Sequence, residues 1–307
     1  MPGSIWTQKE TEKLIQERNK SNGDDVAFSR RYRCNRTVHA IRAKVKYLRD
    51  GGLINKRVIE TPTPNILFFD IETLPIICYT WGIWEQNVLL ENIIKDWCVL
   101  SWSANWEGDE RIFGDILAPK EAMARNDERL LGGMWKLLDR ADIVVSQNGK
   151  RFDHKKLNAR FIHYKNTPPA PYRIIDTLAV AKSVAGFTSN KLDWLAQETG
   201  VETRKSETGM ELWRKCDAGD SESLAKMLEY NLGDVLELKQ VYTELRPWIV
   251  NHPNINMYMD VPSNACPVCG GGLVDIGRYP TQNRKARSVR CCDCGWVGRV
   301  YAVKLEA

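Results

Sequence analysis

The hydrophobic and polar positions change period several times along the chain, and each change predicts a different kind of element. Residues 37–49 repeat apolar side chains with a helical period, which places Val38, Ile41 and Val45 on one face. From residue 66 onward, short apolar runs typical of strands give way to longer amphipathic stretches typical of helices. Strands are predicted at 66–69, 76–84, 97–103 and 143–145, and helices at 120–139, 153–163, 192–199 and 221–245. Consecutive strands followed by helix-separated strands favour an α/β fold, a mixed sheet with helices on both faces.

Two proline-containing stretches predict where this fold begins and ends. Thr61 to Pro64 reads as a stiff extended linker, and residues 251–262 form a polar connector. The chain is therefore expected to contain a small helical domain, a large α/β domain and a short C-terminal domain. Their expected bounds are 1–58, 62–250 and 263–307.

The first of these domains carries helix start and stop signals. Thr7 and Glu10 have the spacing of a capping box at the start of one helix. Asp24 or Asp25 is expected to cap a second helix, and Gly51 to end the third.

The N-terminal segment also resembles a known DNA-binding module. A tryptophan leads the first helix, Arg36 opens the basic third helix, and that helix ends in Lys46-Tyr47-Leu48. This arrangement is similar to a Myb or SANT-type helix-turn-helix, although the later tryptophans of Myb repeats are missing. The resemblance implies a third helix that enters the DNA major groove, with Arg36, Arg42 and Lys46 as contact residues. A helical bundle with a solvated basic face, used for protein contacts, is the alternative.

Composition and charge narrow the class of protein. No apolar run approaches the ~20 residues that a membrane helix needs, so we expect no membrane partner. The N-terminus has no secretory signal pattern, which favours the reducing cytoplasm. The net charge of +5 is uneven, because residues 1–60 hold 14 Lys and Arg against 7 Asp and Glu, while the middle of the chain is acidic. Basic ends around an acidic middle are expected if the ends meet a polyanion and the middle holds metal ions.

The first acidic motif follows the strand predicted at 66–69. Asp70 and Glu72 are separated by one residue, so on a strand both side chains point to the same face. Two carboxylates near the end of a buried strand repel each other and resist desolvation. Such a pair is tolerated where a cation lies between the carboxylates, although a solvated strand end is the simpler reading of this pair alone.

Two further stretches add acids and a phenol. An Asn-Gly turn at Asn148 precedes a helix that opens with Asp153. Tyr230 and Asp234 lie four residues apart on the helix predicted at 221–245, so both project from one face. Taken separately, Asp153 reads as a helix cap and Asp234 as an exposed acid of an amphipathic helix.

Together the three stretches resemble the motifs of the DEDD exonuclease superfamily, which has a ribonuclease H-like fold. The spacing from Tyr230 to Asp234 matches its tyrosine branch, and Glu229 stands where the histidine branch carries a histidine. The resemblance covers residues 66–245 and also includes 173–178 and 190–196, particularly as in phage and bacterial members. It implies a 3′-5′ exonuclease acting on DNA or RNA with a free 3′ end, encoded by a phage or bacterium and active in the cytoplasm.

The resemblance also implies a role for each residue. Asp70, Glu72, Asp153 and Asp234 would hold two Mg²⁺ or Mn²⁺ ions, which suit hard carboxylate ligands. Tyr230, with an ordinary pKa of about 10, would orient the attacking water rather than deprotonate it. Asn148 is expected to support the strand or to contact the substrate. His154, beside Asp153, is expected to be a surface residue.

The C-terminal segment carries two Cys-x-x-Cys-Gly motifs. Cys266, Cys269, Cys291 and Cys294 provide four thiolates, the ligand set of a closed tetrahedral zinc site, with Cys292 as an alternative to Cys291. The segment is similar to a zinc ribbon, in which one structural Zn²⁺ replaces a hydrophobic core. Its arginines form a basic surface, and Arg287 is its expected nucleic-acid contact.

The sequence therefore predicts a two-metal exonuclease with two nucleic-acid-binding modules. A chain of 307 residues has no room for a polymerase as well, so a polymerase or replication protein would act in trans. The alternative is a DNA-binding regulator in which the helix-turn-helix and zinc ribbon dominate and the exonuclease-like domain is a scaffold. An adaptor that recruits replication proteins through the acidic middle is a third reading.

Overall fold

A computed structural model of the chain describes residues 6–20, 38–50, 63–200, 209–259, 265–280 and 285–301. The chain divides into two compact units, Met1–Glu60 and Thr61–Ala307. In the part of the chain that the structure describes, none of the helices has the length and apolar character that crossing a lipid bilayer requires.

The N-terminal unit contains α1 (Gln8–Lys20) and α3 (Val38–Asp50). The predicted capping box is confirmed, because the Thr7 backbone N–H donates to Glu10 Oε2 at 2.9 Å and the Glu10 backbone N–H donates to Thr7 Oγ1 at 3.3 Å. The apolar face of α3 packs on α1 through a small cluster formed by Leu14, Ile41, Val45 and Leu48. The second helix expected near Asp24 and Asp25 lies outside the described residues.

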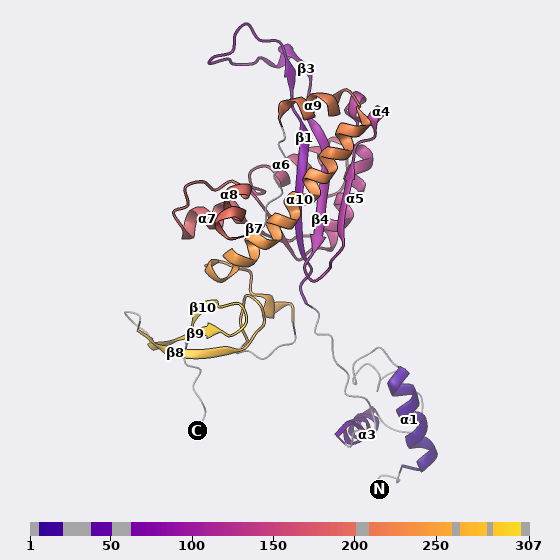
Figure 1. Cartoon of the computed structure of the whole chain (residues 1–307). Helices are drawn as coiled ribbons and strands as arrows, with labels where there is room; N and C mark the ends of the chain where they lie inside the picture. Colours follow the sequence, from indigo (N-terminus) through magenta and orange to yellow (C-terminus); the bar gives the residue numbers. More distant parts are fainter. Residues whose placement is uncertain are drawn as a thin grey trace. The chain divides into compact units, whose positions relative to one another are not determined.

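The second unit is built around a five-stranded mixed sheet of order β5-β4-β1-β6-β7. Figure 1 shows this sheet with α10 lying along it. The strands are β1 (Ile66–Leu74), β4 (Cys98–Trp106), β5 (Ile112–Ile116), β6 (Ile143–Ser146) and β7 (Arg173–Asp176). The central strand β1 pairs antiparallel with β4 and parallel with β6. It is buried by neighbours on both edges and by helices on both faces, which explains its nearly continuous apolar sequence.

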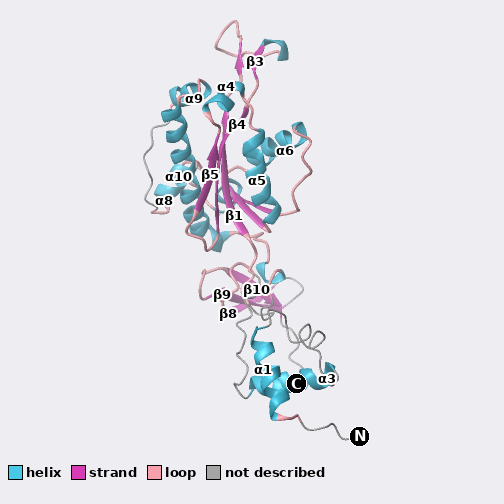
Figure 2. Cartoon of the chain, turned by 90° about the vertical axis from the view of Figure 1, so that its right-hand side faces the viewer, coloured by secondary structure: helices cyan, strands magenta, loops and turns pink. Residues whose placement is uncertain are grey.

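Helices cover both faces of this sheet, and alternate residues of β1 point to each face. On one face, Ile66 and Phe68 pack with Val235, Leu238 and Tyr242 of α10 (Ser221–Leu245). On the other face, the odd-numbered residues Leu67, Phe69 and Ile71 of β1 pack with α5 (Glu128–Arg140) and α6 (Asp153–His163). Figure 2 shows these two helices beside the sheet. Shorter helices complete the layers: α4 (Pro119–Ala124), α7 (Thr177–Val184), α8 (Leu192–Glu198) and α9 (Met210–Asp217). The predicted ribonuclease H-like α/β architecture is confirmed.

Two predictions about elements were wrong. The expected strand at 76–84 is only β2 (Ile77–Cys78), which pairs with β3 (Ile93–Lys95), because the rest of the segment has no partner strand in the described part of the chain. The expected helix at 120–139 is interrupted at Arg125, which adopts a left-handed φ of 53°. The break places Asp127 where its carboxylate accepts from the Val99 backbone N–H at 2.8 Å and pairs with Arg160 at 2.6 Å.

The C-terminal part of this unit is a three-stranded antiparallel sheet of order β10-β9-β8. Its strands are β8 (Leu273–Pro280), β9 (Lys285–Cys291) and β10 (Val297–Tyr301). Its apolar cluster is formed by Cys266, Val268 and Cys291, with few other side chains packed on them. A core this small needs an additional constraint to hold it together.

Candidate functional site

Three of the predicted carboxylates meet between β1 and α10. Asp70 and Glu72 continue the even-numbered face of β1, the face that α10 covers. Asp234 projects from α10 toward them, and the carboxylate oxygens of the three residues lie within 4.8 Å of one another. The period of the strand and the position on the helix thus bring together acids that are more than 160 residues apart in the sequence.

The fourth predicted carboxylate, Asp153, lies beside this group and is not one of its three members. It opens α6 with 1% of its surface exposed, and its Oδ1 accepts a hydrogen bond from the Ile71 backbone N–H at 3.2 Å. The pairing of β1 with β6 ends at Phe68. Beyond that point the Asp153 side chain, rather than β6, accepts the hydrogen bond from the backbone of β1. Its charge is close enough to repel both Asp70 and Glu72.

The electrostatics of the four acids favour protons or cations in the site. Burial, followed by repulsion from Asp153, Glu72 and Asp234, raises the pKa of Asp70 well above its ordinary value. Burial and then the charges of Asp234 and Asp153 raise the pKa of Glu72 to about 8. Burial raises the pKa of Asp153 to about 7, although hydrogen bonds from its own backbone N–H and that of Ile71 oppose the rise.

The pKa of Asp234 is raised for a similar reason. Burial and the Glu237 charge raise it to about 7, and a hydrogen bond from the Tyr230 hydroxyl lowers it. Tyr230 and Asp234 thus share one face of α10, as their spacing predicts. A divalent cation relieves the repulsion that protons would otherwise relieve, and four carboxylates are the hard oxygen donors that Mg²⁺ or Mn²⁺ binds. The residues present therefore fit such ions.

Asn231 is a member of this site that the sequence reasoning missed. Its side chain has no exposed surface, and its Nδ2 donates to Asp70 Oδ2 at 2.7 Å. Ser101 Oγ donates to Asn231 Oδ1 at 3.0 Å, and Ser103 Oγ donates to the Asn231 carbonyl at 2.6 Å. Two serines at alternate positions of a largely apolar strand, opposite Glu72 and Asp70 in the register, were the available signal.

The Asn-Gly turn before α6 has a structural role that the geometry explains. Asn148 adopts a left-handed φ of 60°, and its backbone N–H donates to Asp176 Oδ1 at 3.0 Å. Asp176 is buried and also accepts from the Lys150 backbone N–H at 3.3 Å. A Cβ at Gly149 would clash with the buried Ser146 side chain, so any larger residue would force that side chain to move. Sequence reasoning placed Asp176 in a family-like segment but missed this function.

The Asn148 side chain borders an open pocket of about 460 Å³ between this turn and α8. Lys182 and Lys191 also line the pocket, so cations and amides face the same space. Contact of Asn148 with a substrate stays a prediction.

The expectation that His154 is a surface residue was wrong. It is 5% exposed, its ring packs edge-on against Phe69, and its Nδ1 lies 3.0 Å from the Tyr172 hydroxyl. Burial lowers its pKa to about 4, so the imidazole is neutral. The first turn of α6 packs against β1, where Asp153 contacts Ile71 and His154 contacts Phe69. Both side chains are therefore buried.

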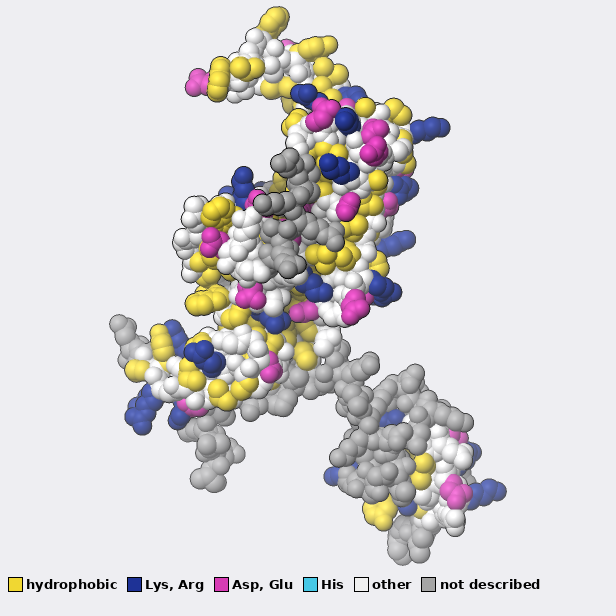
Figure 3. Space-filling model, viewed as in Figure 1, with side chains coloured by type: hydrophobic (Ala, Val, Ile, Leu, Met, Phe, Trp, Pro, Cys, Tyr) yellow, Lys and Arg dark blue, Asp and Glu magenta, His cyan; other side chains and the backbone are white. Residues whose placement is uncertain are grey.

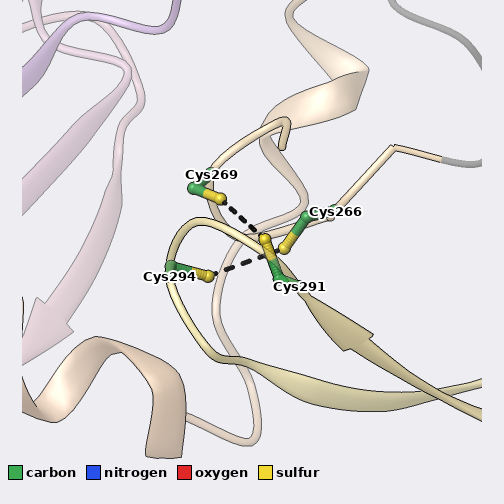
Figure 4. A group of neighbouring side chains, drawn as sticks. All are labelled: Cys266, Cys269, Cys291 and Cys294. Atoms are coloured by element: carbon green, nitrogen blue, oxygen red, sulfur yellow. Dashed lines mark hydrogen bonds between the residues drawn. The ribbon is translucent and has the colours of Figure 1, made fainter. Parts of the chain in front are cut away.

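The second cluster is formed by Cys266, Cys269, Cys291 and Cys294, whose sulfur atoms lie within 4.8 Å of one another (Figure 4). Backbone N–H groups of Val268 and Asp293 each approach a sulfur atom at 3.4 Å. Gly270 and Gly295 both have a φ of 75°, which permits the tight turns that converge the thiols. Four thiols in this arrangement are the donor set of a closed zinc site.

Cys291 rather than Cys292 belongs to this cluster. Cys292 is exposed, whereas Cys291 is 2% exposed at the end of β9. Burial raises the pKa of Cys291, but hydrogen bonds from neighbouring backbone N–H groups and thiols outweigh it and lower the pKa to about 7. A lowered pKa favours the thiolate, which is the form that binds a metal ion.

The structure describes the side chains of only some of the residues predicted to contact nucleic acid. Arg36 lies outside the described residues, and of Arg42 only the backbone, within α3, is described. Lys46 is exposed on α3. Arg287 forms an ion pair with Asp275 on the neighbouring strand β8, so its charge is partly neutralised within the sheet.

Comparison with known proteins matched part of the chain to a family model and to a solved structure. Residues 103–246 match the family model described as RNase_H superfamily. A family B DNA polymerase from the hyperthermophilic archaeon Pyrobaculum calidifontis aligns at a TM-score of 0.45 and 16% identity, covering 61% of this chain and 25% of the polymerase. The chain thus spans about a quarter of that polymerase. A search of curated proteins found no match.

Proposed function

We propose that the protein is a metal-dependent 3′-5′ exonuclease that hydrolyses phosphodiester bonds of DNA or RNA. The single observation that carries the proposal is the convergence of Asp70, Glu72 and Asp234 within 4.8 Å on a ribonuclease H-like sheet. The family match over residues 103–246 supports a nuclease. The 3′-5′ direction follows from the resemblance of the motifs to the tyrosine branch of DEDD exonucleases.

In this proposal Asp70, Glu72, Asp153 and Asp234 hold two Mg²⁺ or Mn²⁺ ions. When bound, such ions activate water and stabilise charge on the leaving 3′ oxygen. The Tyr230 hydroxyl, which donates to Asp234 without substrate, is positioned on the same face of α10 to orient the attacking water. Asn231 fixes the orientation of the Asp70 carboxylate through its 2.7 Å hydrogen bond.

The proposal also assigns roles to the segments on either side of the exonuclease domain. We assign residues 1–58 to a helix-turn-helix-like module, 62–250 to the exonuclease domain and 263–307 to a zinc ribbon with one Zn²⁺. Both ends carry an excess of Lys and Arg, which supports contact with a polyanion such as the nucleic-acid substrate. A polymerase or replication protein acting in trans remains the proposed protein partner.

The test uses purified full-length protein and oligonucleotides labelled at the 5′ or the 3′ end. Single-stranded DNA, duplex DNA and RNA are each incubated with Mg²⁺, Mn²⁺ or a chelator. We expect stepwise shortening from the 3′ end that requires metal and is lost in Asp70→Asn. Glu244→Gln, an exposed position on the same helix as Asp234, is the matched control and keeps full activity.

Other results would refute the proposal. Digestion that persists in Asp70→Asn would show that these carboxylates are not the catalytic group. Sequence-selective DNA binding by wild-type protein, without digestion of any substrate in either metal, would favour the DNA-binding regulator instead.

A further inference from the structure

The segment Pro75–Asp96, called the arm below, leaves the sheet after β1 and returns to it before β4. Among the residues that the structure describes, its two strands, β2 and β3, pair only with each other. Between them the chain forms a loop and a short 3₁₀ helix, Leu90–Asn92. The arm is therefore an excursion of the chain that adds nothing to the five-stranded sheet.

A partly buried charge network fixes the base of the arm. Arg125 Nη1 donates to the Pro75 carbonyl at 2.7 Å and to the Asp96 carbonyl at 2.6 Å, so one guanidinium joins both ends. Its Nε donates to Asp217 Oδ1 at 2.8 Å, and Lys95 pairs with the same carboxylate at 3.2 Å. Arg125 holds this position with a left-handed φ of 53°, a backbone conformation that costs free energy.

The rest of the arm exposes apolar side chains. Trp81 is fully exposed, and Trp84 and Ile83 are 81% and 86% exposed. Figure 3 shows hydrophobic side chains gathered over the β2–β3 projection. The exposed large apolar residues of the arm are Ile76, Tyr79, Trp81, Ile83, Trp84, Val88, Leu89, Leu90 and Ile94. Exposed apolar side chains gathered on one projection in this number mark an interaction site.

Charge limits the kind of partner. Between residues 76 and 94 the sequence contains Glu85 and Glu91 and no Lys or Arg. A nucleic-acid surface would need cations for the phosphates, and an anionic membrane would need them for the headgroups. Aromatic and aliphatic side chains with few charges are instead the composition of the buried centre of a protein–protein interface.

The area of the arm is large enough for a dimer of this chain. An aromatic side chain buries about 150–250 Å² on contact, so Tyr79, Trp81 and Trp84 together offer roughly 500 Å², and the exposed aliphatic residues raise the total to about 1,000 Å². A stable interface needs about 800 Å² from each partner. In a two-fold dimer the same patch serves on both copies, which suits a surface that is apolar at its centre.

We propose that the arm is a dimerisation surface, on which Trp81, Ile83 and Trp84 of one copy pack against the arm of a second copy. The Arg125 network holds the base of the arm in place before association, which lowers the entropy lost on binding. This inference does not depend on the proposed nuclease activity.

The test is sedimentation equilibrium of full-length protein across the micromolar range, with metal chelated. Wild type is expected to dimerise, and Trp81→Ser/Trp84→Ser is expected to weaken the dimer about a hundredfold or more, because truncating interface tryptophans removes its strongest contacts. Trp248→Ser/Val250→Ser is the matched control, since both residues are exposed outside the arm, and it should dimerise like wild type. Circular dichroism checks that each variant is folded.

Three outcomes overturn the proposal. One is a wild-type protein that stays monomeric across this range. Another is equal dimerisation of the arm variant and wild type. The third is a monomer in which the arm substitutions weaken binding to a single-stranded oligonucleotide or to phosphatidylcholine vesicles, which would assign the arm to that ligand.

Discussion

Asn231 Nδ2 donates a hydrogen bond to Asp70 Oδ2 at 2.7 Å, from a side chain with no exposed surface. The asparagine is held in turn by Ser101 and Ser103 of β4, so helix α10, strand β4 and strand β1 meet at one carboxylate. An amide that donates to a carboxylate stabilises its charged form, and this hydrogen bond lowers the pKa of Asp70 against the effect of burial.

Replacing Asn231 by Ala should weaken metal binding more than it weakens substrate binding. A hydrogen bond to a charged group contributes about 1.5–3 kcal/mol, so the Mg²⁺ concentration for half-maximal activity should rise about tenfold or more. Ser101→Ala removes only the support of the amide and should give a smaller rise. Activity titrated with Mg²⁺ and calorimetry with Mn²⁺ measure the effect. Equal metal affinity in Asn231→Ala and wild type would show that Asn231 does not position Asp70.

Replacing Asp234 by Asn should abolish activity and stabilise the metal-free protein. The buried carboxylate has a pKa raised to about 7, which means that ionising it costs stability, whereas a neutral amide carries no such cost. We expect a gain of roughly 1–3 kcal/mol in unfolding free energy at pH 8 in chelator. Thermal denaturation of the variant beside Glu244→Gln tests this. An unchanged or lowered Tm would argue against repulsion in the site.

The stability of the metal-free protein should fall as pH rises. Glu72, Asp153 and Asp234 have folded-state pKa values of about 8, 7 and 7, above the ordinary carboxyl range near 4. Between about pH 4 and pH 8 the folded state therefore binds more protons than the unfolded state. The associated stability is fully present below about pH 4 and is lost as pH passes through 7 to 8. Tm measured from pH 5 to 9 in chelator should decrease, and saturating Mn²⁺ should flatten the decrease. A Tm that rises over this interval would contradict the predicted loss of stability with rising pH.

Cys291→Ser and Cys292→Ser should differ in zinc content. Cys291 contributes its sulfur to the four-thiol cluster and Cys292 is exposed outside it. We expect Cys292→Ser to retain about one equivalent of zinc and Cys291→Ser to lose most of it. Elemental analysis of purified full-length protein gives the answer. Zinc lost from both variants alike, or from neither, would contradict this ligand set.

Gly149→Ala should destabilise the protein and Gly132→Ala should not. A Cβ at Gly149 would clash with the Ser146 side chain, whereas a Cβ at Gly132 in α5 meets open space. We expect a loss of about 1–3 kcal/mol for the first and a gain of up to about 1 kcal/mol for the second, since alanine favours a helix. Denaturant unfolding compares the two. Equal effects would mean that the turn at Asn148 can move without strain.

Local patterns in the sequence were sufficient for the elements whose cause is local. The capping box of Thr7 and Glu10 and the bounds of helix Ser221–Leu245 follow from caps and periodicity that act over a few residues. The period of two along β1 likewise predicts that Asp70 and Glu72 share a face. The approach of the two cysteines within each Cys-x-x-Cys pair could be expected because a tight turn brings them together.

Tertiary structure decided what depends on contacts distant in sequence. The apolar residues after Ile76 read as a strand, yet no strand pairs with the segment beyond Cys78, and hydrogen-bond partners cannot be read from one segment alone. His154 is buried because the inward turn of α6 carries it toward Phe69. Asn231 meets Asp70 across 161 residues of chain. The sequence by itself determines side-chain types and short-range periodicity. Burial and hydrogen-bond partners are determined only when separate helices and strands pack together.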